Sequence, residues 1–434
     1  MMAIMLSVLD STIANVALPT IATEFGTTPS RAIWIVNGYQ LAIVISLLPF
    51  ASLGEIHGYR RVQSLGIAVF TLASLACVFA PSLAMLSAAR VVQGFGAAAM
   101  MSVNGALLRY TMPSRQFGSA IGFNATVVAA SATIGPTLAG FMLSVASWPW
   151  LFAINVPLGI VAAIVGWTSL PDSHRAQRRF DWTSAVLTAA TIALAILAID
   201  GIGHGLPGWA IGALLSGLAV AGVLLVRREL GMTDPLLPLD LLRLPVFGLS
   251  IAASVSAFMA QMMAFVSMPF LLQSTYGYSP HEVGLLLMPW PLALAVAAPL
   301  TGRLSNRVSP AVLGGLGLTL LSAGLFALSR LPADPGAIDI VWRMVLCGLG
   351  FGLFQSPNNR TLLGAAPMRR SGAASGMLGT ARLLGQTIGT ALVGLLLAQF
   401  GMGGAPWALS AAAVIAFVAA LVSLSRRAAF RAQE

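Results

Sequence analysis

The chain contains no lysine and only two cysteines, and its charged residues amount to 8% of 434 residues. Soluble globular domains carry roughly 25% charged residues, so this composition excludes a soluble fold. Without lysine there is also no phosphate-binding loop of the Walker type, which excludes an ATP-driven pump built on one. Cys77 and Cys347 both lie in apolar runs, where we expect small buried hydrophobes rather than a disulfide or metal ligands.

Histidine is equally sparse. The four histidines lie in loops or at the ends of apolar runs, with no spacing typical of metal ligands: His57, His174, His204 and His281. We therefore expect no enzymatic activity, no bound metal and no cofactor. A non-transporting scaffold or sensor stays open as an alternative, although the buried acid and the internal repeat described below argue against it.

Hydrophobic residues are abundant, at 58% of the chain, and they form long continuous runs separated by short loops. A helix needs about 20 apolar residues to cross a bilayer, and only helices or closed barrels satisfy their backbone in lipid. Since the runs do not alternate as barrel strands do, we predict an all-α polytopic membrane protein. The fourteen predicted spans lie near residues 1–22, 31–53, 62–81, 84–108, 116–143, 150–170, 182–203, 208–226, 246–272, 282–302, 311–330, 338–360, 371–399 and 405–425.

The net charge of +10 comes from arginines that lie mainly in the short loops. This pattern indicates membrane topology rather than nucleic-acid binding. With the N-terminus in the cytoplasm, eighteen arginines fall inside, Arg426 among them, and three fall outside (Arg31, Arg330 and Arg343). Because basic loops are retained on the cytoplasmic side, we predict that both termini are cytoplasmic.

An internal repeat divides the chain. Residues 113–140 align with residues 367–394 without a gap and with eleven identities in 28 positions. Both copies follow a basic loop and run outward, which indicates parallel halves of the kind found in transporters. We predict a six-helix bundle over 1–172, a two-helix insert with linkers over 173–244, and a second six-helix bundle over 245–434.

One acidic residue lies deep in a predicted span. Asp10 is about twelve residues from the outer end of the first run, hence roughly 18 Å deep at 1.5 Å per residue; Asp200 and Glu282 lie near span ends. Carboxylates at such depth are costly, and they usually face a cavity and serve coupling ions or substrate. Asn15 shares the polar side of the helix with Asp10. The alternative is a carboxylate kept only to pair with an arginine.

The fourth span carries Arg90, about six residues or ~9 Å below the outer surface. Gln93, Gly94 and Asn104 share its helix face by spacing. A buried guanidinium needs a partner, and Asp10 is the evident one. If the two meet, the proton occupancy of the carboxylate would respond to water access and to substrate, as a proton antiporter requires.

The fifth span has a stripe of small residues with a proline in its outer half, including Gly135, Pro136 and Gly140. Small residues let helices approach closely. Close packing and a rocking or sealing hinge are both compatible with this stripe.

The second repeat copy carries an arginine at a depth where the first copy has none. Arg382 lies about twelve residues from the basic loop, hence ~18 Å deep. Two roles stay open for it: donation to Gln355, Asn358 or Asn359 of the preceding span, or contact with substrate.

Four segments together are similar to the major facilitator superfamily, in its fourteen-span drug:proton antiporter branch. They are LDSTIANVALP at 9–19, RVVQGFGAAA at 90–99, Gly135-Pro136 with Gly140, and WPWLFAINVPLGI at 148–160, supported by FLLQSTYGYSPHEVGLLLMP at 270–289. The resemblance covers nearly the full length. It implies that Asp10 and Arg90 take the family's proton-coupling positions and that Gly94 and Gly135-Pro136 with Gly140 belong to its gating and antiporter motifs.

The loop after the second span departs from the family's pattern. That pattern is Gly-Asp-Arg-x-Gly-Arg-Arg, whereas this chain reads Gly54-Glu55-Ile56-His57-Gly58-Tyr59-Arg60-Arg61. The acid and the second glycine are kept and an arginine is lost. The resemblance implies a gating role for Gly54, Glu55, Gly58 and Arg60, with a weaker latch.

We expect proton-driven export of lipophilic, cationic or neutral drugs or antiseptics. Methionine and aromatic side chains adapt to varied ligands, and a cation stacks on an aromatic face. The predicted substrate cavity between the halves is lined by Asn15, Tyr39, Gln40, Gln261, Met262, Phe265, Gln273, Trp290, Gln355 and Arg382.

The alternative is the same fold exporting one specific metabolite, siderophore or lipid, or importing a nutrient. In either case we expect a bacterial inner-membrane protein whose partners are the lipid bilayer, protons and small amphipathic substrates, with no nucleic acid. Whether a periplasmic adaptor also binds is left open by the sequence.

Overall fold

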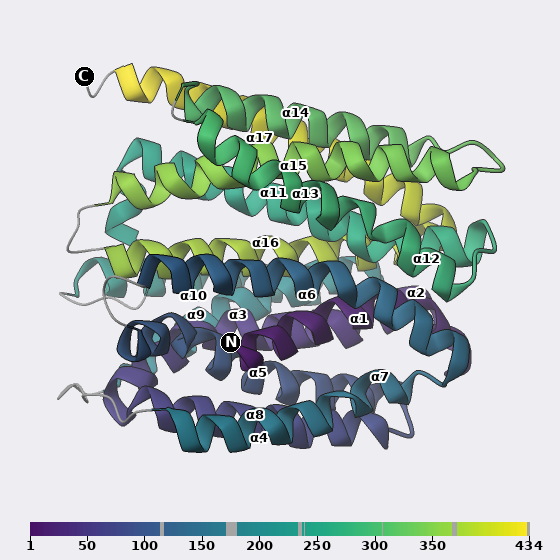
Figure 1. The fold of residues 1–434 in the computed structure, drawn as a ribbon, viewed down its shortest axis with the longest axis horizontal. Coiled ribbons are helices and arrows are strands. Elements are labelled where there is room, and N and C mark those ends of the chain that lie inside the picture. The colour runs from purple at the N-terminus through teal and green to yellow at the C-terminus, as the bar shows by residue number, and fades with distance from the viewer. Residues whose placement is uncertain are drawn as a thin grey trace.

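A computed structural model describes residues 1–112, 117–170, 180–232, 237, 239–305, 307–366 and 371–431. Every regular element in these residues is helical, and no strand occurs among them. The long helices run side by side along one direction (Figure 1). The all-α membrane fold predicted from the apolar runs is therefore confirmed.

The first group of helices is formed by the N-terminal part of the chain. Its members are α1 (Met2–Glu24), α2 (Pro29–Ala32), α3 (Trp34–His57), α4 (Tyr59–Val78), α5 (Leu83–Thr111), α6 (Phe117–Val145), α7 (Pro149–Ala153) and α8 (Asn155–Ser169). Within this group α5 packs on α3 and α4, α6 packs on α1, and α8 packs on α4. Two further long helices follow, α9 (Trp182–Gly203) and α10 (Gly208–Leu230), and they pack on each other.

The second group is formed by the C-terminal part. Its members are η1 (Leu239–Arg243), α11 (Pro245–Phe270), η2 (Leu271–Thr275), α12 (Pro280–Leu287), α13 (Pro289–Leu304), α14 (Pro310–Ser329), α15 (Ala337–Ala365), α16 (Ser371–Phe400), η4 (Gly401–Gly403) and α17 (Gly404–Arg431). Here α14 packs on α15 and α17, and α11 packs on α16 and α17.

Each of the fourteen predicted runs falls on one long helix or on a broken pair of helices. Twelve described segments are long and apolar enough to cross a bilayer; one of them, Ala374–Arg426, covers both α16 and α17. Helix α6 contributes only the shorter apolar stretch Ala130–Val145. The number of fourteen spans therefore stays a prediction.

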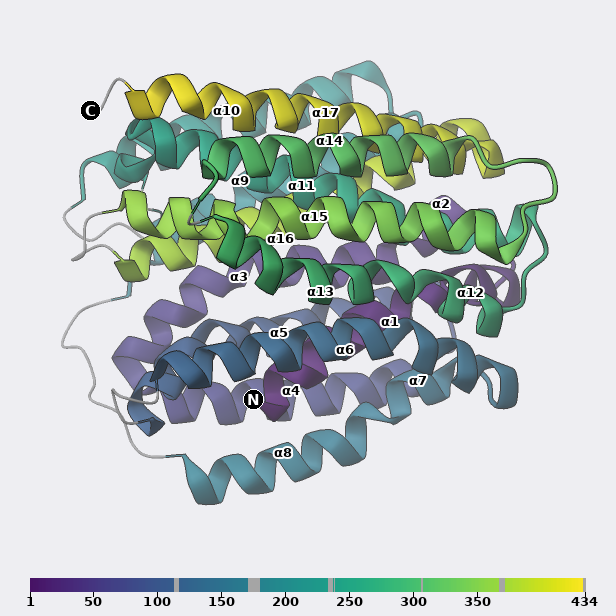
Figure 2. The same cartoon turned by 45° about the horizontal axis from the view of Figure 1, so that its top comes forward.

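The two groups touch along several helix pairs, among them α1 and α11. Helix α6 packs on α12, and α3 packs on α16. In both views α6 and α12 lie side by side at the right-hand end (Figures 1 and 2). Helix α9 contacts both groups, since it packs on α3 and on α16. The inserted pair thus lies against the seam between the groups.

Helix α9 begins at a capped position. The Asp181 carboxylate accepts a hydrogen bond from Ser184 N at 3.1 Å and one from Arg228 Nη2 of α10 at 2.9 Å. Partial burial raises the pKa of the Asp181 carboxyl, but these hydrogen bonds outweigh burial and hold the pKa below its usual value. An N-cap carboxylate of this kind stabilises the first turn of a helix. Here it also ties the start of α9 to the end of α10.

The turn between α3 and α4 depends on Gly58. Its φ of +99° lies in a region that side chains rarely adopt, so glycine is required there. Gly54, one turn earlier, lies against Val103 of α5, whose Cγ1 would be 2.7 Å from an added Cβ. The two glycines kept from the family's loop pattern therefore serve a sharp turn and a close helix contact.

One arginine of the predicted cytoplasmic set packs inside the second group. Arg426 was assigned to a cytoplasmic segment, but α17 continues past it and its side chain is fully buried in the second group. Neutral oxygens receive the guanidinium: Ser250 Oγ at 2.9 Å, Asn358 Oδ1 at 2.6 Å, and Ser423. The predicted cytoplasmic arginines 115, 175, 178, 179, 369 and 370 lie outside the described residues.

Candidate functional site

Asp10 and Arg90 form an ion pair in the interior of the first group. The Arg90 Nη1 atom lies 2.5 Å from Asp10 Oδ2, and the two side chains are 0% and 1% exposed. Helix α1 supplies the carboxylate and α5 the guanidinium. The predicted pairing is therefore present in the structure, between residues that are 80 positions apart in sequence.

Neutral amides complete the environment of the carboxylate. Asp10 Oδ1 accepts hydrogen bonds from Gln93 Nε2 at 3.0 Å and from Asn155 Nδ2 at 2.7 Å. Gln93 also donates to Ser74 Oγ of α4 at 2.8 Å and accepts from Arg90 Nη1. Sequence spacing had placed Gln93 on the Arg90 face. We call the side chains of Asp10, Ser74, Arg90, Gln93 and Asn155 the polar cluster.

Two members of the polar cluster were missed by the sequence analysis. Asn155 lies at the start of α8, inside the quoted motif at 148–160, and Ser74 lies inside the apolar run of α4. Both are fully buried. An amide within an otherwise apolar run was the available signal for Asn155, whereas a serine in such a run is too common to single out.

Aromatic rings hold the arginine from its other side. The Arg90 Cζ atom lies 4.0 Å from the centroid of the Tyr39 ring and 5.4 Å from that of Phe152. Arg90 Nε donates to Ile35 O at 3.1 Å. Cation–π contacts of this kind are stronger away from water. Tyr39 was predicted to line a cavity, and in this structure it is buried and stacks on Arg90.

The carboxylate of Asp10 is closed inside one bundle. Its hydrogen-bond partners come from α5 and α8, which both belong to the first group. The sequence analysis expected a carboxylate at this depth to face a cavity. In the structure the Asp10 side chain is 1% exposed, pairs with Arg90 and accepts hydrogen bonds from Gln93 and Asn155.

Glycines allow the helices of the first group to approach closely. An added Cβ at Gly94 would lie 2.5 Å from Tyr39 O of α3, and one at Gly135 would collide with the hydroxyl of Thr12 on α1. These glycines hold α5 and α6 against the helices that carry Tyr39 and Asp10. The packing role of the small-residue stripe is thus visible in the structure.

The same stripe continues into the contact with the second group. An added Cβ at Gly140 would lie 2.5 Å from Pro280 O of α12, and one at Gly284 would collide with Pro136 O. Thr137 Oγ1 donates toward Gly284 O at 3.5 Å. Backbone therefore meets backbone where the two groups join at the predicted outer ends of α6 and α12.

Several predicted cavity residues meet at the junction of the groups. Gln40 Nε2 of α3 donates to Met262 Sδ of α11 at 3.6 Å. Gln273 Nε2 donates to Val16 O of α1 at 2.9 Å. Gln40 and Met262 are buried. The sequence reasoning thus selected residues that join the halves.

The remaining predicted cavity residues are distributed around that junction. The Phe265 and Trp290 rings pack with centroids 5.1 Å apart. The Asn15 side-chain oxygen is buried without a hydrogen-bond partner. Gln261 and Gln355 are half-buried on α11 and α15. Their role toward a substrate stays a prediction.

The loop-motif residues lie at the turn after α3. Arg60 Nη2 donates to Trp167 O at 2.7 Å, at the end of α8, and its Cζ lies 5.7 Å from the Trp167 ring centroid. Glu55 and Arg60 both make further interactions. The motif therefore links the start of α4 to α8 within the first group.

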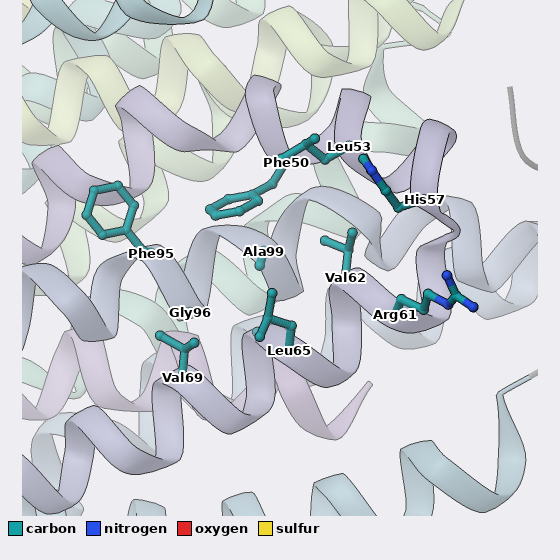
Figure 3. Close-up of a pocket in the computed structure, with 11 residues that line it drawn as sticks. Phe50, Leu53, His57, Arg61, Val62, Leu65, Val69, Phe95, Gly96 and Ala99 are labelled. Atoms are coloured by element: carbon teal, nitrogen blue, oxygen red, sulfur yellow. The ribbon is translucent and has the colours of Figure 1, made fainter. Parts of the chain in front are cut away.

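A cavity of about 340 Å³ lies between α3, α4 and α5 (Figure 3). Most of its lining is apolar, and His57 and Arg61 stand at one end with Phe95 at the other. Its lining residues all belong to the first group. This cavity is therefore distinct from the predicted substrate site between the halves.

Comparison with known proteins shows which family and which individual proteins the chain is similar to. The sequence profile of the Major Facilitator Superfamily matches residues 1–386 and 249–433. The chain is 55% identical over 422 residues to the uncharacterized transporter YebQ of Escherichia coli, covering 97% of this chain and 92% of that protein. It is 32% identical over 395 residues to the multidrug resistance protein Stp of Mycobacterium tuberculosis, covering 90% and 73%.

Among solved structures, the fold matches a bacterial homologue of the human lysosomal transporter Spinster in an inward-facing, occupied conformation. The TM-score is 0.69 at 17% identity, covering 99% of this chain and 95% of that one. At this identity the match shows the fold. Together with the profile match over nearly the full length, it shows that this chain belongs to the Major Facilitator Superfamily and is a multi-span membrane transporter rather than an enzyme.

Proposed function

We propose that this transporter exports lipophilic, amphipathic compounds from the bacterial cytoplasm in exchange for protons. The observation that carries the proposal is the fully buried Asp10–Arg90 pair with its amide donors. The multidrug resistance protein Stp, 32% identical to this chain, supports the choice of lipophilic substrates.

The polar cluster gives a physical reason for proton coupling. As a carboxylate, Asp10 accepts from Arg90, Gln93 and Asn155 and holds α1 against α5 and α8. A proton on Asp10 removes the charge that these donors stabilise and leaves a buried guanidinium without its counter-ion, which is strongly unfavourable. Protonation therefore favours a rearrangement in which Arg90 finds another partner or water.

The contact between α6 and α12 supplies an element on which such a rearrangement can act. Backbone at Gly140 and Gly284 packs directly against the opposite helix. Closely packed backbone contacts either hold or separate, and a packed interface of this kind has discrete states rather than a continuous range. In the proposed cycle, protonation of Asp10 changes the packing of α1 against α6 and thereby biases this contact.

The test measures dye transport into proteoliposomes. The buffers inside and outside the vesicles differ in pH, so that a proton gradient across the membrane drives exchange. The wild-type protein should move a lipophilic fluorescent dye only with the gradient. Asp10→Asn should reduce that transport at least about tenfold, because an asparagine amide does not ionise near neutral pH as a carboxyl group does. Asp339→Asn is the matched control, since Asp339 pairs with Arg343 at the start of α15, outside the polar cluster. Gradient-driven transport that persists in Asp10→Asn would remove the proton-coupling assignment.

Substrate breadth is tested by the same vesicles with a panel of unrelated lipophilic compounds. Transport of several members supports a multidrug exporter. Transport of a single metabolite, siderophore or lipid, or uptake of a nutrient, would favour the narrower alternative on the same fold.

A further inference from the structure

Arg382 is a guanidinium in the interior of the membrane-spanning region with no acidic partner among the described residues. It lies on α16 and is half-buried, its Nε is buried without a hydrogen-bond partner, and its Cζ lies 5.6 Å from the Phe258 ring centroid. The sequence analysis left two roles open. One of the three acceptors considered for it, Asn358 Oδ1, instead accepts from Arg426 at 2.6 Å.

The contacts of glycines on α16 show the direction in which the Arg382 side chain points. Glycines 385 and 389 pack against the backbone of α11, and glycines 376 and 379 lie toward Leu48 and Leu47 of α3. At 100° per residue, Arg382 lies about 60° from both Gly385 and Gly379 around the helix. The guanidinium therefore points into the wedge between α11 and α3, where the second group faces the first.

Neighbouring contacts support this placement. Leu383 belongs to a hydrophobic cluster with Leu6 of α1 and Ile43 of α3. One turn beyond Phe258 on α11, Met262 accepts a hydrogen bond from Gln40 of α3. The Gln40 side-chain oxygen has no donor. The wedge thus contains an unpaired cation, an aromatic face and an amide, contributed by both groups.

The charges in the interior do not balance. Asp10 is neutralised by Arg90, and Arg426 is held by neutral oxygens of Ser250, Asn358 and Ser423. In the described part of the chain, no carboxylate pairs with Arg382 or with Arg426. A buried charge without a partner is costly, and ionisable residues within spans are kept chiefly for function.

We propose that Arg382 binds the anionic group of an amphipathic substrate, while the Phe258 ring packs against the guanidinium. The substrate class is thus an amphipathic carboxylate or phenolate rather than the lipophilic cation expected from the sequence. This inference rests on the proposed export function and assigns the charge of its cargo. A planar guanidinium donates two parallel hydrogen bonds to a carboxylate, which gives both affinity and orientation.

The experiment compares two dyes that share a tricyclic aromatic frame and differ in charge. Fluorescein is the anionic probe, and tetramethylrhodamine methyl ester is the cationic one. Equilibrium binding to the purified protein in detergent at neutral pH is measured by fluorescence anisotropy. We expect the wild-type protein to bind fluorescein more tightly. Arg382→Gln should weaken fluorescein binding about 10–100-fold, the range for a lost charge-assisted hydrogen bond, and leave the cationic dye unchanged or bound more tightly.

Two further variants distinguish the loss of positive charge at Arg382 from a general effect of replacing an arginine. Arg382→Lys retains the charge and should keep most of the preference for fluorescein, while Arg343→Gln removes an arginine that pairs with Asp339 and should change neither affinity. Size-exclusion elution and thermal unfolding verify the fold of each variant. Equal loss of both dyes in Arg382→Gln with the fold intact, unchanged fluorescein binding, or a wild-type preference for the cation would each overturn the proposal.

Failure of this proposal and failure of proton coupling are separable. Dye binding is measured at equilibrium without a pH gradient, whereas proton coupling is measured by the gradient dependence of transport in Asp10→Asn. Gradient-driven movement of the cationic dye by a protein that ignores fluorescein would keep the export function and reject the Arg382 assignment.

Discussion

Arg90 Nη1 lies 2.5 Å from Asp10 Oδ2 in a place where neither side chain is more than 1% exposed. This contact joins α1 to α5 through one ion pair, and Asn155 adds α8 through the same carboxylate. Removing one partner of a buried pair leaves the other charge unmatched, which is more damaging than removing both. The pair therefore predicts a specific pattern among variants.

Arg90→Gln alone should destabilise the protein by about 3–5 kcal/mol, because the Asp10 carboxylate loses its counter-ion. The double variant with Asp10→Asn should recover a large part of that stability, since two neutral amides hydrogen-bond without a buried charge. Thermal unfolding in detergent, monitored by intrinsic tryptophan fluorescence, measures the cycle. Additive losses in the double variant would mean that the two residues are not energetically coupled.

Gly140→Leu should disturb the contact between α6 and α12. A leucine there has to displace Pro280 O, which lies 2.5 Å from the position of an added Cβ. Overpacking of this kind costs about 1–3 kcal/mol, enough to shift the equilibrium away from the closed contact about fivefold or more. Spin labels at exposed Ser144 of α6 and exposed Leu285 of α12 should report a longer or broader distance distribution.

The matched control for that variant is Gly105→Leu on α5. An added Cβ at Gly105 meets no atom within 4 Å. The label distances and the transport rate should therefore stay at wild-type values. A distance change of similar size in both variants would show that leucine acts through general destabilisation rather than through the α6–α12 contact.

Gly58→Ala should destabilise the turn between α3 and α4 by about 1–3 kcal/mol, the usual cost of a strained backbone conformation. The φ of +99° at this position is the reason. The comparison variant is Gly105→Ala, which replaces a helical glycine in open space and should stabilise by about 0.5–1 kcal/mol. Opposite signs in the shift of the unfolding midpoint are the expected result, and equal shifts would contradict it.

The Asp181–Arg228 pair predicts a pH dependence of stability. Because the pKa of Asp181 is lowered in the folded state, its carboxylate contributes fully to folding stability at pH values above the ordinary carboxyl pKa. That contribution is lost as the pH falls through the folded-state pKa. Asp181→Asn should cost about 0.2–1 kcal/mol at neutral pH, as for other partly exposed pairs. The difference from wild type should begin to shrink at about pH 4 and vanish once the pH lies below the folded-state pKa. A difference that grows on acidification would refute this assignment.

Much of the fold was accessible from the sequence because lipid imposes a simple rule on composition. Each predicted apolar run lies on a helix or a broken pair in the structure, since only such runs survive in the bilayer. The pairing of Asp10 with Arg90 followed from the same physics, because a buried charge requires a partner. Helical spacing then placed Gln93 beside Arg90.

The rest of the site depends on packing that spacing along one helix does not determine. Asn155 and Ser74 join the polar cluster only because α4 packs against α5 and α8 packs against α4. Counting basic residues in terminal segments could not reveal that Arg426 donates to oxygens of Ser250, Asn358 and Ser423. Tyr39 was assigned to a cavity, while the structure stacks its ring on Arg90 at 4.0 Å.

Helix α9 has a mechanical consequence for any rocking motion. Trp34 Nε1 of α3 donates to Asp200 Oδ1 at 2.9 Å, and an added Cβ at Gly203 would lie 3.0 Å from Leu395 Cα of α16. Helix α9 is thus attached both to α3 of the first group and to α16 of the second group. In the proposed cycle, a movement of α3 away from α16 would make α9 slide along at least one of them, so these contacts of the inserted pair would slow the exchange.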